Sequence, residues 1–76
     1  MALTKEEKLF LKRLGLRIRQ LREERGWTLE ETEDYGWISW RHLQQIESGR
    51  KNINFITILR LAKLFNISVK TLISGF

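Results

Sequence analysis

The sequence predicts an all-α fold, a compact five-helix bundle that contains a helix-turn-helix. Three observations support this prediction. The 76 residues include no proline, no strand-like alternation of apolar and polar residues is sustained, and helix start signals recur five times. The length suits a single domain over residues 1–76 and leaves no room for a second hydrophobic core.

Five residues are in position to cap the start of a helix. Thr4 with Glu7 and Thr28 with Glu31 fit the capping box, in which a hydroxyl and a carboxylate satisfy the free backbone N–H groups of a first turn. Serine and asparagine are also preferred caps. The remaining candidates, each preceded by an isoleucine, are Ser39, Asn54 and Ser68.

The predicted helix ends depend on residues that tolerate a left-handed backbone. Glycine and asparagine adopt this conformation at low cost and commonly follow the last helical residue. The candidates for the first four helices are Gly26, Gly36, Gly49 and Asn66. Together, the starts and ends predict helices over residues 5–25, 29–35, 40–48, 55–65 and 69–74.

Apolar residues of the first and fourth predicted helices recur at three- and four-residue spacing, which is typical of a face buried in a bundle. In the first helix this stripe consists of Phe10, Leu14, Ile18 and Leu21. In the fourth helix it consists of Ile58, Leu61, Ala62 and Phe65. These residues are the predicted core.

The net charge of +5 lies in the second half of the chain. Residues 1–38 hold eight basic and eight acidic residues, whereas residues 39–76 hold six basic residues and only Glu47 as an acid. A positive excess on one part of a small domain favours a polyanionic partner such as nucleic acid.

The composition argues against an enzyme, a metal site and a membrane protein. There is no cysteine, and His42 alone cannot form a zinc site. No apolar run reaches the roughly 18 residues needed to cross a bilayer, and the start, MALTKEEK, lacks the apolar core of a signal peptide. The best acid–base candidates, His42 and Glu47, fall on different sides of one short helix. We therefore expect a cytoplasmic protein without catalytic residues, cofactor or metal, and no small-molecule ligand is evident.

The predicted helices over 29–35 and 40–48, with a short turn between them, match a helix-turn-helix in length and punctuation. The second helix carries Leu43 and Ile46 on one face. Arginine can form paired hydrogen bonds to guanine and glutamine to adenine, so the opposite face can read base edges in the major groove. That face has no acid and consists of Arg41, Gln44, Gln45 and Ser48.

The segment after this helix is suited to phosphate binding. Residues 49–52 read Gly-Arg-Lys-Asn, which offers two cations, an amide and backbone N–H groups. The candidate phosphate contacts are Ser39, Arg50, Lys51 and Asn52.

Three stretches over about residues 15–73 stand in a recognisable order and spacing: LGLRIRQLREERGWTLEE, ISWRHLQQIESGRKN and ITILRLAKLFNISVKTLI. In these stretches the chain resembles the phage-repressor and Cro type of helix-turn-helix regulator, the XRE family, which includes the controller proteins of restriction–modification systems. The resemblance implies a lambda repressor-like domain whose helix 29–35 crosses the DNA backbone and whose helix 40–48 lies in the major groove. By matched position, the base contacts would be Trp40, Arg41, Gln44 and Gln45.

The resemblance also implies an ion pair and a dimer. It pairs Arg22, near the end of the first helix, with Glu47 in the stretch IESG. Members of the family commonly dimerise through the fifth helix, so a homodimer on a two-fold symmetric DNA operator is expected, acting as a transcriptional regulator at the nucleoid. The apolar stripe that would form the interface, or would instead close the core of a monomer, is Val69, Leu72, Ile73 and Phe76.

The helix over 29–35 departs from the family pattern in its register. Without a gap, the small alanine and the turn glycine of the family fall on Glu33 and Trp37. A shift of one residue puts Thr32 and Gly36 in those places, but Trp37 then becomes an insertion and Glu31 is directed at the core. The sequence leaves both registers open.

The same helix also departs from the family in its chemistry. Leu29 stands where a glutamine usually grips a phosphate, and four acids follow it: Glu30, Glu31, Glu33 and Asp34. An acidic surface is unfavourable next to phosphates. The alternative function is therefore a protein-interaction module of the antitoxin type, with the same fold and weak or no DNA binding.

Overall fold

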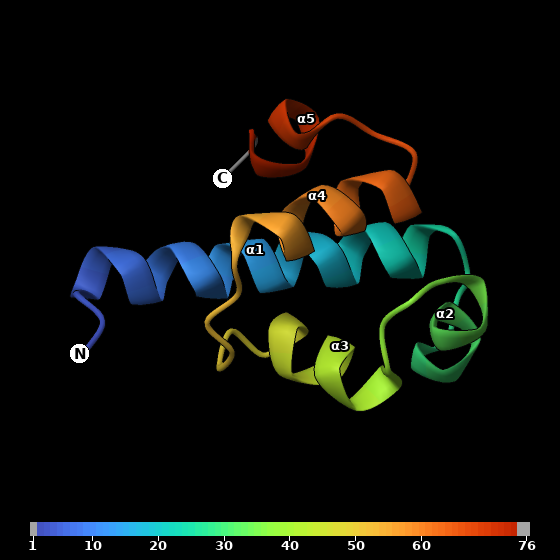
Figure 1. Ribbon diagram of the computed structural model, residues 1–76, viewed down its shortest axis with the longest axis horizontal. Helices are drawn as coiled ribbons and strands as arrows, with labels where there is room; N and C mark the ends of the chain where they lie inside the picture. The colour runs from blue at the N-terminus through green and yellow to red at the C-terminus, as the bar shows by residue number, and fades with distance from the viewer. Residues whose placement is uncertain (1, 75–76) are drawn as a thin grey trace.

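The structure is a computed structural model that describes residues 2–74, and within that range it contains five helices and no strand. The helices agree with the predicted segments to within about one residue at each end. Figure 1 shows their arrangement. They are α1 (Lys5–Glu24), α2 (Leu29–Tyr35), α3 (Trp40–Glu47), α4 (Phe55–Leu64) and α5 (Val69–Ile73).

Each helix begins where a side chain satisfies its first backbone N–H groups. Thr4 and Thr28 form complete capping boxes with Glu7 and Glu31. The other three N-caps use a hydroxyl or an amide oxygen as acceptor, as predicted, and they are Ser39, Asn54 and Ser68. These local contacts explain why the starts were predictable residue by residue.

Three of the four predicted left-handed residues have that conformation, namely Gly26, Gly49 and Asn66. The prediction was wrong for Gly36, which is extended, with φ of −136°. A side chain at position 36 would instead meet Leu64, because its Cβ would lie 3.2 Å from Leu64 Cδ1. The constraint that the structure shows at Gly36 is therefore the nearby side chain of Leu64 and not a left-handed backbone.

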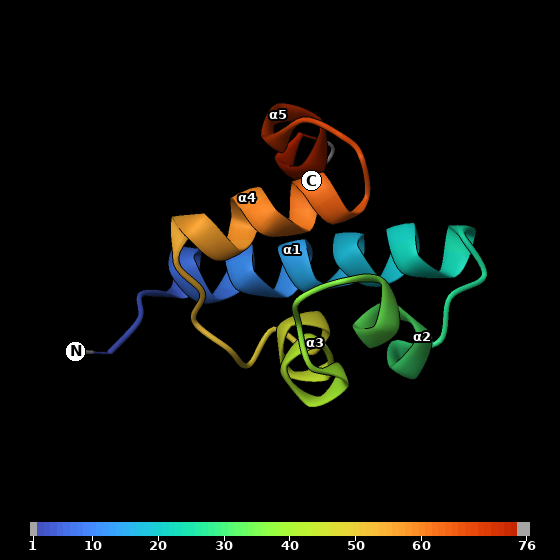
Figure 2. The ribbon, with the colours of Figure 1, turned by 45° about the vertical axis from the view of Figure 1, so that its right-hand side comes forward.

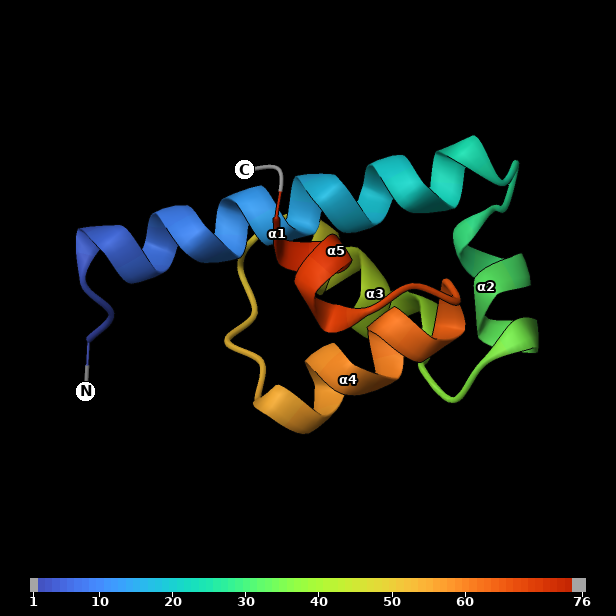
Figure 3. The ribbon, with the colours of Figure 1, turned by 90° about the horizontal axis from the view of Figure 1, so that it is seen from above.

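The helices form three layers. In Figures 1 and 2, α1 and α4 lie in the middle, α5 lies above them, and α2 and α3 lie below them. Figure 3, seen from above, shows that the first turns of α1 extend beyond the other helices. The face that carries α3 is therefore opposite to the face that carries α5.

The core lies between the layers and contains most of the predicted apolar stripes, with contributions from α3 and α5. The prediction that Phe10 belongs to the core was wrong. Phe10 is 38% exposed, and Leu11 is buried instead. Ile58 is only partly buried. The buried cluster consists of Leu14, Ile18, Leu21, Ile38, Leu43, Ile46, Leu61, Ala62, Phe65 and Leu72.

The side chains of α2 differ in burial, and the two registers predict different patterns. Thr32 is completely buried and its hydroxyl donates to the carbonyl of Thr28, whereas Glu33 is exposed. Burial of Thr32 and exposure of Glu33 are what the shifted register predicts for these two residues. Glu31 does not point at the core, as that register had implied, because it is exposed and caps the start of α2.

No helix within residues 2–74 is both long enough and apolar enough to cross a membrane.

Candidate nucleic-acid interface

The side chains of α3 divide between the core and the surface as the sequence predicted. Leu43 and Ile46 are buried, and they hold α3 against α1 and α2. The opposite face is exposed over its whole length, and its side chains are Arg41, Gln44, Gln45 and Ser48. This face carries one cation and two amides and no acid.

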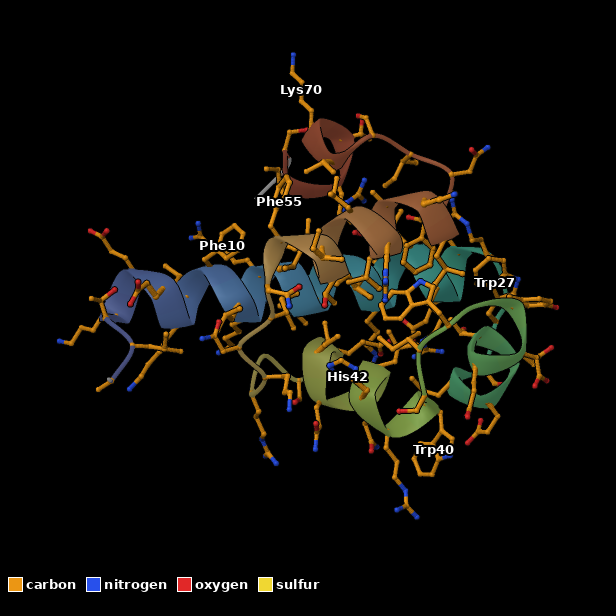
Figure 4. The ribbon with its side chains drawn as sticks, in the orientation of Figure 1. Phe10, Trp27, Trp40, His42, Phe55 and Lys70 are labelled. Atoms are coloured by element: carbon orange, nitrogen blue, oxygen red, sulfur yellow. The ribbon has the colours of Figure 1, made fainter. Side chains whose placement is uncertain are left out.

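The first turn of α3 presents an aromatic ring and a guanidinium side by side. Trp40 is partly exposed, and Figure 4 shows its ring directed away from the other helices. The guanidinium carbon of Arg41 lies 5.3 Å from the centre of that ring, which is the geometry of a cation–π contact. The backbone N–H of Trp40 donates to Glu33 Oε2 at 3.2 Å, so an acid of α2 caps the start of α3.

Five of the predicted outer-face and phosphate-contact residues line one cleft at the end of α3. The cleft has a volume of about 520 Å³, and its lining residues are Gln44, Gln45, Ser48, Arg50 and Lys51. Ser39 lies at the other end of the helix, where its hydroxyl oxygen accepts the backbone N–H of His42.

The loop after α3 differs from the sequence prediction in two respects. The backbone N–H groups of Gly49 and Arg50 donate to Ile46 and Gln45 at the end of α3, so they are already used. Asn52 lines a different cleft, beside Leu3 and the start of α1. The structure therefore groups Arg50 with Lys51 but separates both from Asn52.

An ion pair fixes α3 to the end of α1. Arg22 Nε donates to Glu47 Oε2 at 2.7 Å and Arg22 Nη2 donates to Glu47 Oε1 at 3.0 Å, with only 11% and 7% of the two side chains exposed. The hydrogen bond to Glu47 raises the pKa of Arg22, so the guanidinium stays charged. Arg22 Nη1 also donates to the carbonyl of Trp27, at 2.6 Å. One side chain therefore connects α1, α3 and the turn before α2.

The backbones of α1 and α3 also touch directly. A Cβ at Gly15 would lie 2.6 Å from the carbonyl oxygen of Glu47 and would contact that of Ile46 even more closely. A Cβ at Gly49, whose φ is +76°, would lie 2.8 Å from Lys12 Cα. Two glycines thus allow the last turn of α3 to rest on the backbone of α1.

The predicted dimer stripe is only partly available at the surface. Leu72 is fully buried in the core between α5 and its neighbours, so its assignment to an interface was wrong. Val69 is partly buried against the same core, and Ile73 is 38% exposed. Phe76 lies outside the described residues.

Both carboxylate oxygens of Glu47 are occupied by Arg22, so Glu47 is not an acid–base partner for His42. Within residues 2–74 no group of histidine and acidic side chains is arranged to hold a metal ion.

Sequence reasoning missed two contacts that position the site. It did not anticipate that Glu33 caps α3, because the two residues are seven apart and belong to different helices. It also missed Arg25, whose guanidinium donates to the carbonyls of Leu21 and Phe65 and joins α1 to the end of α4. A capping glutamate at that spacing and an arginine at a helix end are too common to have indicated these roles.

Comparison with known proteins agrees with this geometry. A helix-turn-helix family model, HTH_3, matches residues 18–72. The HTH-type transcriptional regulator DdrOP3 of Deinococcus deserti is 37% identical over 59 residues, which is 78% of this chain and 46% of that protein. The uncharacterized HTH-type transcriptional regulator y4dJ of Sinorhizobium fredii is 37% identical over 57 residues, which is 75% of this chain and 74% of that protein. The chain thus spans a little under half the length of the first relative.

A solved structure shares the same arrangement of helices. The restriction–modification controller protein C.AhdI from Aeromonas hydrophila superposes with a TM-score of 0.75 and 27% identity, over 82% of this chain and 94% of that one. The family match, the two regulators and the common fold lead to one assignment: this chain belongs to the XRE-type helix-turn-helix family of DNA-binding transcriptional regulators.

Proposed function

We propose that this protein is a sequence-specific, double-stranded DNA-binding transcriptional regulator that acts as a homodimer on a two-fold symmetric operator, with α3 in the major groove. The observation that carries the proposal is the outer face of α3. It is exposed, rich in hydrogen-bond donors and free of acids, and it leads into a cleft lined by Arg50 and Lys51.

The base contacts are assigned to the α3 side chains that reach furthest from the core. Arg41 has the forked donors that match guanine, and Gln44 and Gln45 have the paired donor and acceptor that match adenine. Trp40 offers an apolar surface to a thymine methyl group or the groove wall. Because Arg41 packs on the ring of Trp40, the two side chains would enter the groove together.

The phosphate contacts are assigned to both ends of α3. Arg50 and Lys51 supply the positive charge at its C-terminal end. Ser39 is at the N-terminal end, where its hydroxyl proton is available to a phosphate because its oxygen serves as the acceptor in the cap. Asn52 is exposed on the same loop as Lys51, although it faces another cleft. Such contacts set the position of a protein on the duplex and its salt dependence.

The acids of α2 have local uses that reduce the case for a protein-interaction module. Glu31 completes the capping box of α2, and Glu33 caps α3. Two of the four acids therefore have a role inside the helix-turn-helix itself, and this lowers the need for a partner protein to account for the acidic run.

The proposed dimer interface combines α5 with the first turns of α4. Ile73 and Val69 supply the α5 part. On α4, three apolar side chains share one side by their spacing and are 61%, 53% and 41% exposed: Phe55, Ile56 and Leu59. Because α4 follows the loop that leaves α3, an interface at its start would keep two copies of α3 near one another on DNA. We expect such a regulator to act in the cytoplasm, at the nucleoid.

Selection of bound sites from a random duplex library tests the proposal as a whole. We expect a two-fold symmetric consensus with half-sites about one helical turn, roughly 34–36 Å, apart. Fluorescence anisotropy on the selected site at two salt concentrations should give a steep salt dependence. Failure to enrich any sequence, together with no salt-dependent binding, would contradict it and would favour an interaction module.

A further inference from the structure

A second cleft, away from the outer face of α3, lies where the end of α2 and the α2–α3 turn meet α4. It has a volume of about 590 Å³, within the range of roughly 300–1,000 Å³ that is typical of small-molecule sites. Aromatic and basic side chains line it, and none of its lining residues is acidic. The main ones are Trp27, Tyr35, Trp37, Arg60, Lys63 and Leu64.

The aromatic side chains of this cleft include rings that pack on one another and on the core, and rings that are exposed to solvent. The ring of Trp27 stacks on that of Phe65 with centroids 5.9 Å apart and lies 4.8 Å from that of Tyr35. Tyr35 and Trp37 nevertheless stay 58% and 42% exposed. A planar apolar ligand would cover this surface without displacing any core residue.

The two cations of the cleft have no acidic partner within residues 2–74. Arg60 lies over the ring of Trp37 at 5.4 Å, and neither Arg60 nor Lys63 forms a salt bridge there. Arg25, which also lies over Trp27, differs because its guanidinium is committed to two backbone carbonyls. The cleft therefore holds two positive charges that no negatively charged group balances within the described residues.

We propose that this cleft binds a small planar aromatic carboxylate. The ring would lie against Trp27, Tyr35 and Trp37, and the carboxylate would accept hydrogen bonds from Arg60 and Lys63. An arginine held over an aromatic ring presents its outer N–H groups in the fork that suits a carboxylate. The volume of the cleft favours a small molecule, and the proposal does not depend on DNA binding.

The three tryptophans provide a direct test, since each gives its own indole N–H signal in a nitrogen-labelled NMR spectrum. Trp27 and Trp37 line the cleft, whereas Trp40 does not line it and lies at the start of α3, away from Trp27 (Figure 4). Titration of the whole chain with 2-naphthoate should shift the first two signals saturably and leave the third in place. The neutral analogue 2-naphthamide should bind at least fivefold more weakly.

Two variants distinguish binding at a specific site from nonspecific binding. Arg60→Gln should weaken 2-naphthoate binding at least fivefold and leave 2-naphthamide binding unchanged, because only the carboxylate needs the guanidinium. The matched control, Arg19→Gln on the exposed surface of α1, should bind both compounds like the wild type, with thermal unfolding confirming that each variant is folded.

Three results would overturn the proposal. One is equal movement of all three indole signals, and another is equal affinity for the acid and the amide. The third is an absence of any shift with 2-naphthoate while an acidic, tryptophan-containing peptide moves Trp27 and Trp37, which would make the cleft a protein-docking surface.

Discussion

Arg22 and Glu47 are joined by two hydrogen bonds of 2.7 and 3.0 Å, and the same guanidinium reaches the carbonyl of Trp27. The last residue of α3 is thereby tied to the end of α1 and to the turn that leads into α2. The orientation of the surface assigned to DNA depends on a charge pair that is itself almost fully covered.

Removal of one partner should therefore be costly. Glu47→Ala leaves the guanidinium of Arg22 buried without its carboxylate, and such a change typically lowers the free energy of unfolding by about 3–5 kcal/mol. Urea or thermal unfolding measures it. Glu23→Ala is the matched control, because the Arg19–Glu23 pair is more than half exposed and should be worth less than about 1 kcal/mol. Similar losses in the two variants would contradict a structural role of the buried pair.

Arg41→Ala should alter sequence preference on DNA. Loss of a forked contact to guanine is expected to cost about 1–3 kcal/mol on the selected site and to relax the preference at one base position. Site selection repeated with the variant measures both effects. If binding to all sequences weakens equally, Arg41 touches only phosphate.

Lys51→Ala should weaken binding to every DNA sequence about equally. Each lost phosphate contact reduces the magnitude of the slope of log K against log salt by about 0.9. Lys70→Ala serves as the control because Lys70 lies on α5, on the opposite side of the molecule from Trp40 (Figure 4). A slope identical to that of wild type would remove Lys51 from the contact surface.

Glu31 should make a measurable contribution to the pH dependence of stability. Hydrogen bonds from the backbone N–H of Thr28, and then from its hydroxyl, hold the pKa of Glu31 below its ordinary value of about 4.5. The unfolded chain then binds the proton more readily, so this stabilisation is present above about pH 4.5 and is lost as the pH falls through the folded-state pKa.

Urea unfolding between pH 7 and pH 3 checks this prediction. The stability difference between wild type and Glu31→Gln should shrink as the pH falls, because the amide cannot titrate. Glu24→Gln, at an exposed position outside any capping box, is the control and should retain the pH dependence of wild type. A constant difference for Glu31→Gln across the range would show that the carboxylate charge has no role in the cap.

Ile56→Glu and Ile73→Glu should each convert a dimer into a folded monomer with weaker operator binding, because a charge would be buried in the proposed interface. Sedimentation equilibrium at tens of micromolar protein measures the mass. Tyr35→Glu, on α2 at the far end of the molecule, should remain dimeric. A wild type that is monomeric at that concentration while it binds a palindrome tightly would restrict dimerisation to DNA.

The fold was largely predictable because the signals that start and end its helices are local in the sequence. Capping boxes and left-handed residues act within three or four positions, so the sequence located Thr4, Thr28, Gly26 and Gly49 correctly. Gly36 was misread because contact with Leu64, 28 positions later, determines its environment. Phe10 fits a helical stripe, yet it remains 38% exposed on the first half of α1.

The candidate site was predictable to a similar degree. The outer face of α3 follows from the period of the helix, so Arg41, Gln44 and Gln45 were correctly expected to be exposed. The ion pair of Arg22 and Glu47 was predicted from the resemblance to the helix-turn-helix family. The side chains around Trp37 were not anticipated as a group, because the cleft forms only when α4 packs beside the α2–α3 turn and no sequence period connects residues that far apart.

Gly15 and Gly49, at the contact between α1 and α3, fix the position of α3 independently of the side chains on its outer face. The end of α3 approaches the backbone of α1 at Gly15, and Gly49, just after α3, approaches that of Lys12. Arg41, Gln44 and Gln45 are exposed on the other face of α3, so we expect their exchange to leave the position of the helix on α1 unchanged. Under the proposed function, related chains would acquire new operators by substitutions at these surface positions, whereas a single added methyl group at position 15 would push the end of α3 away from α1.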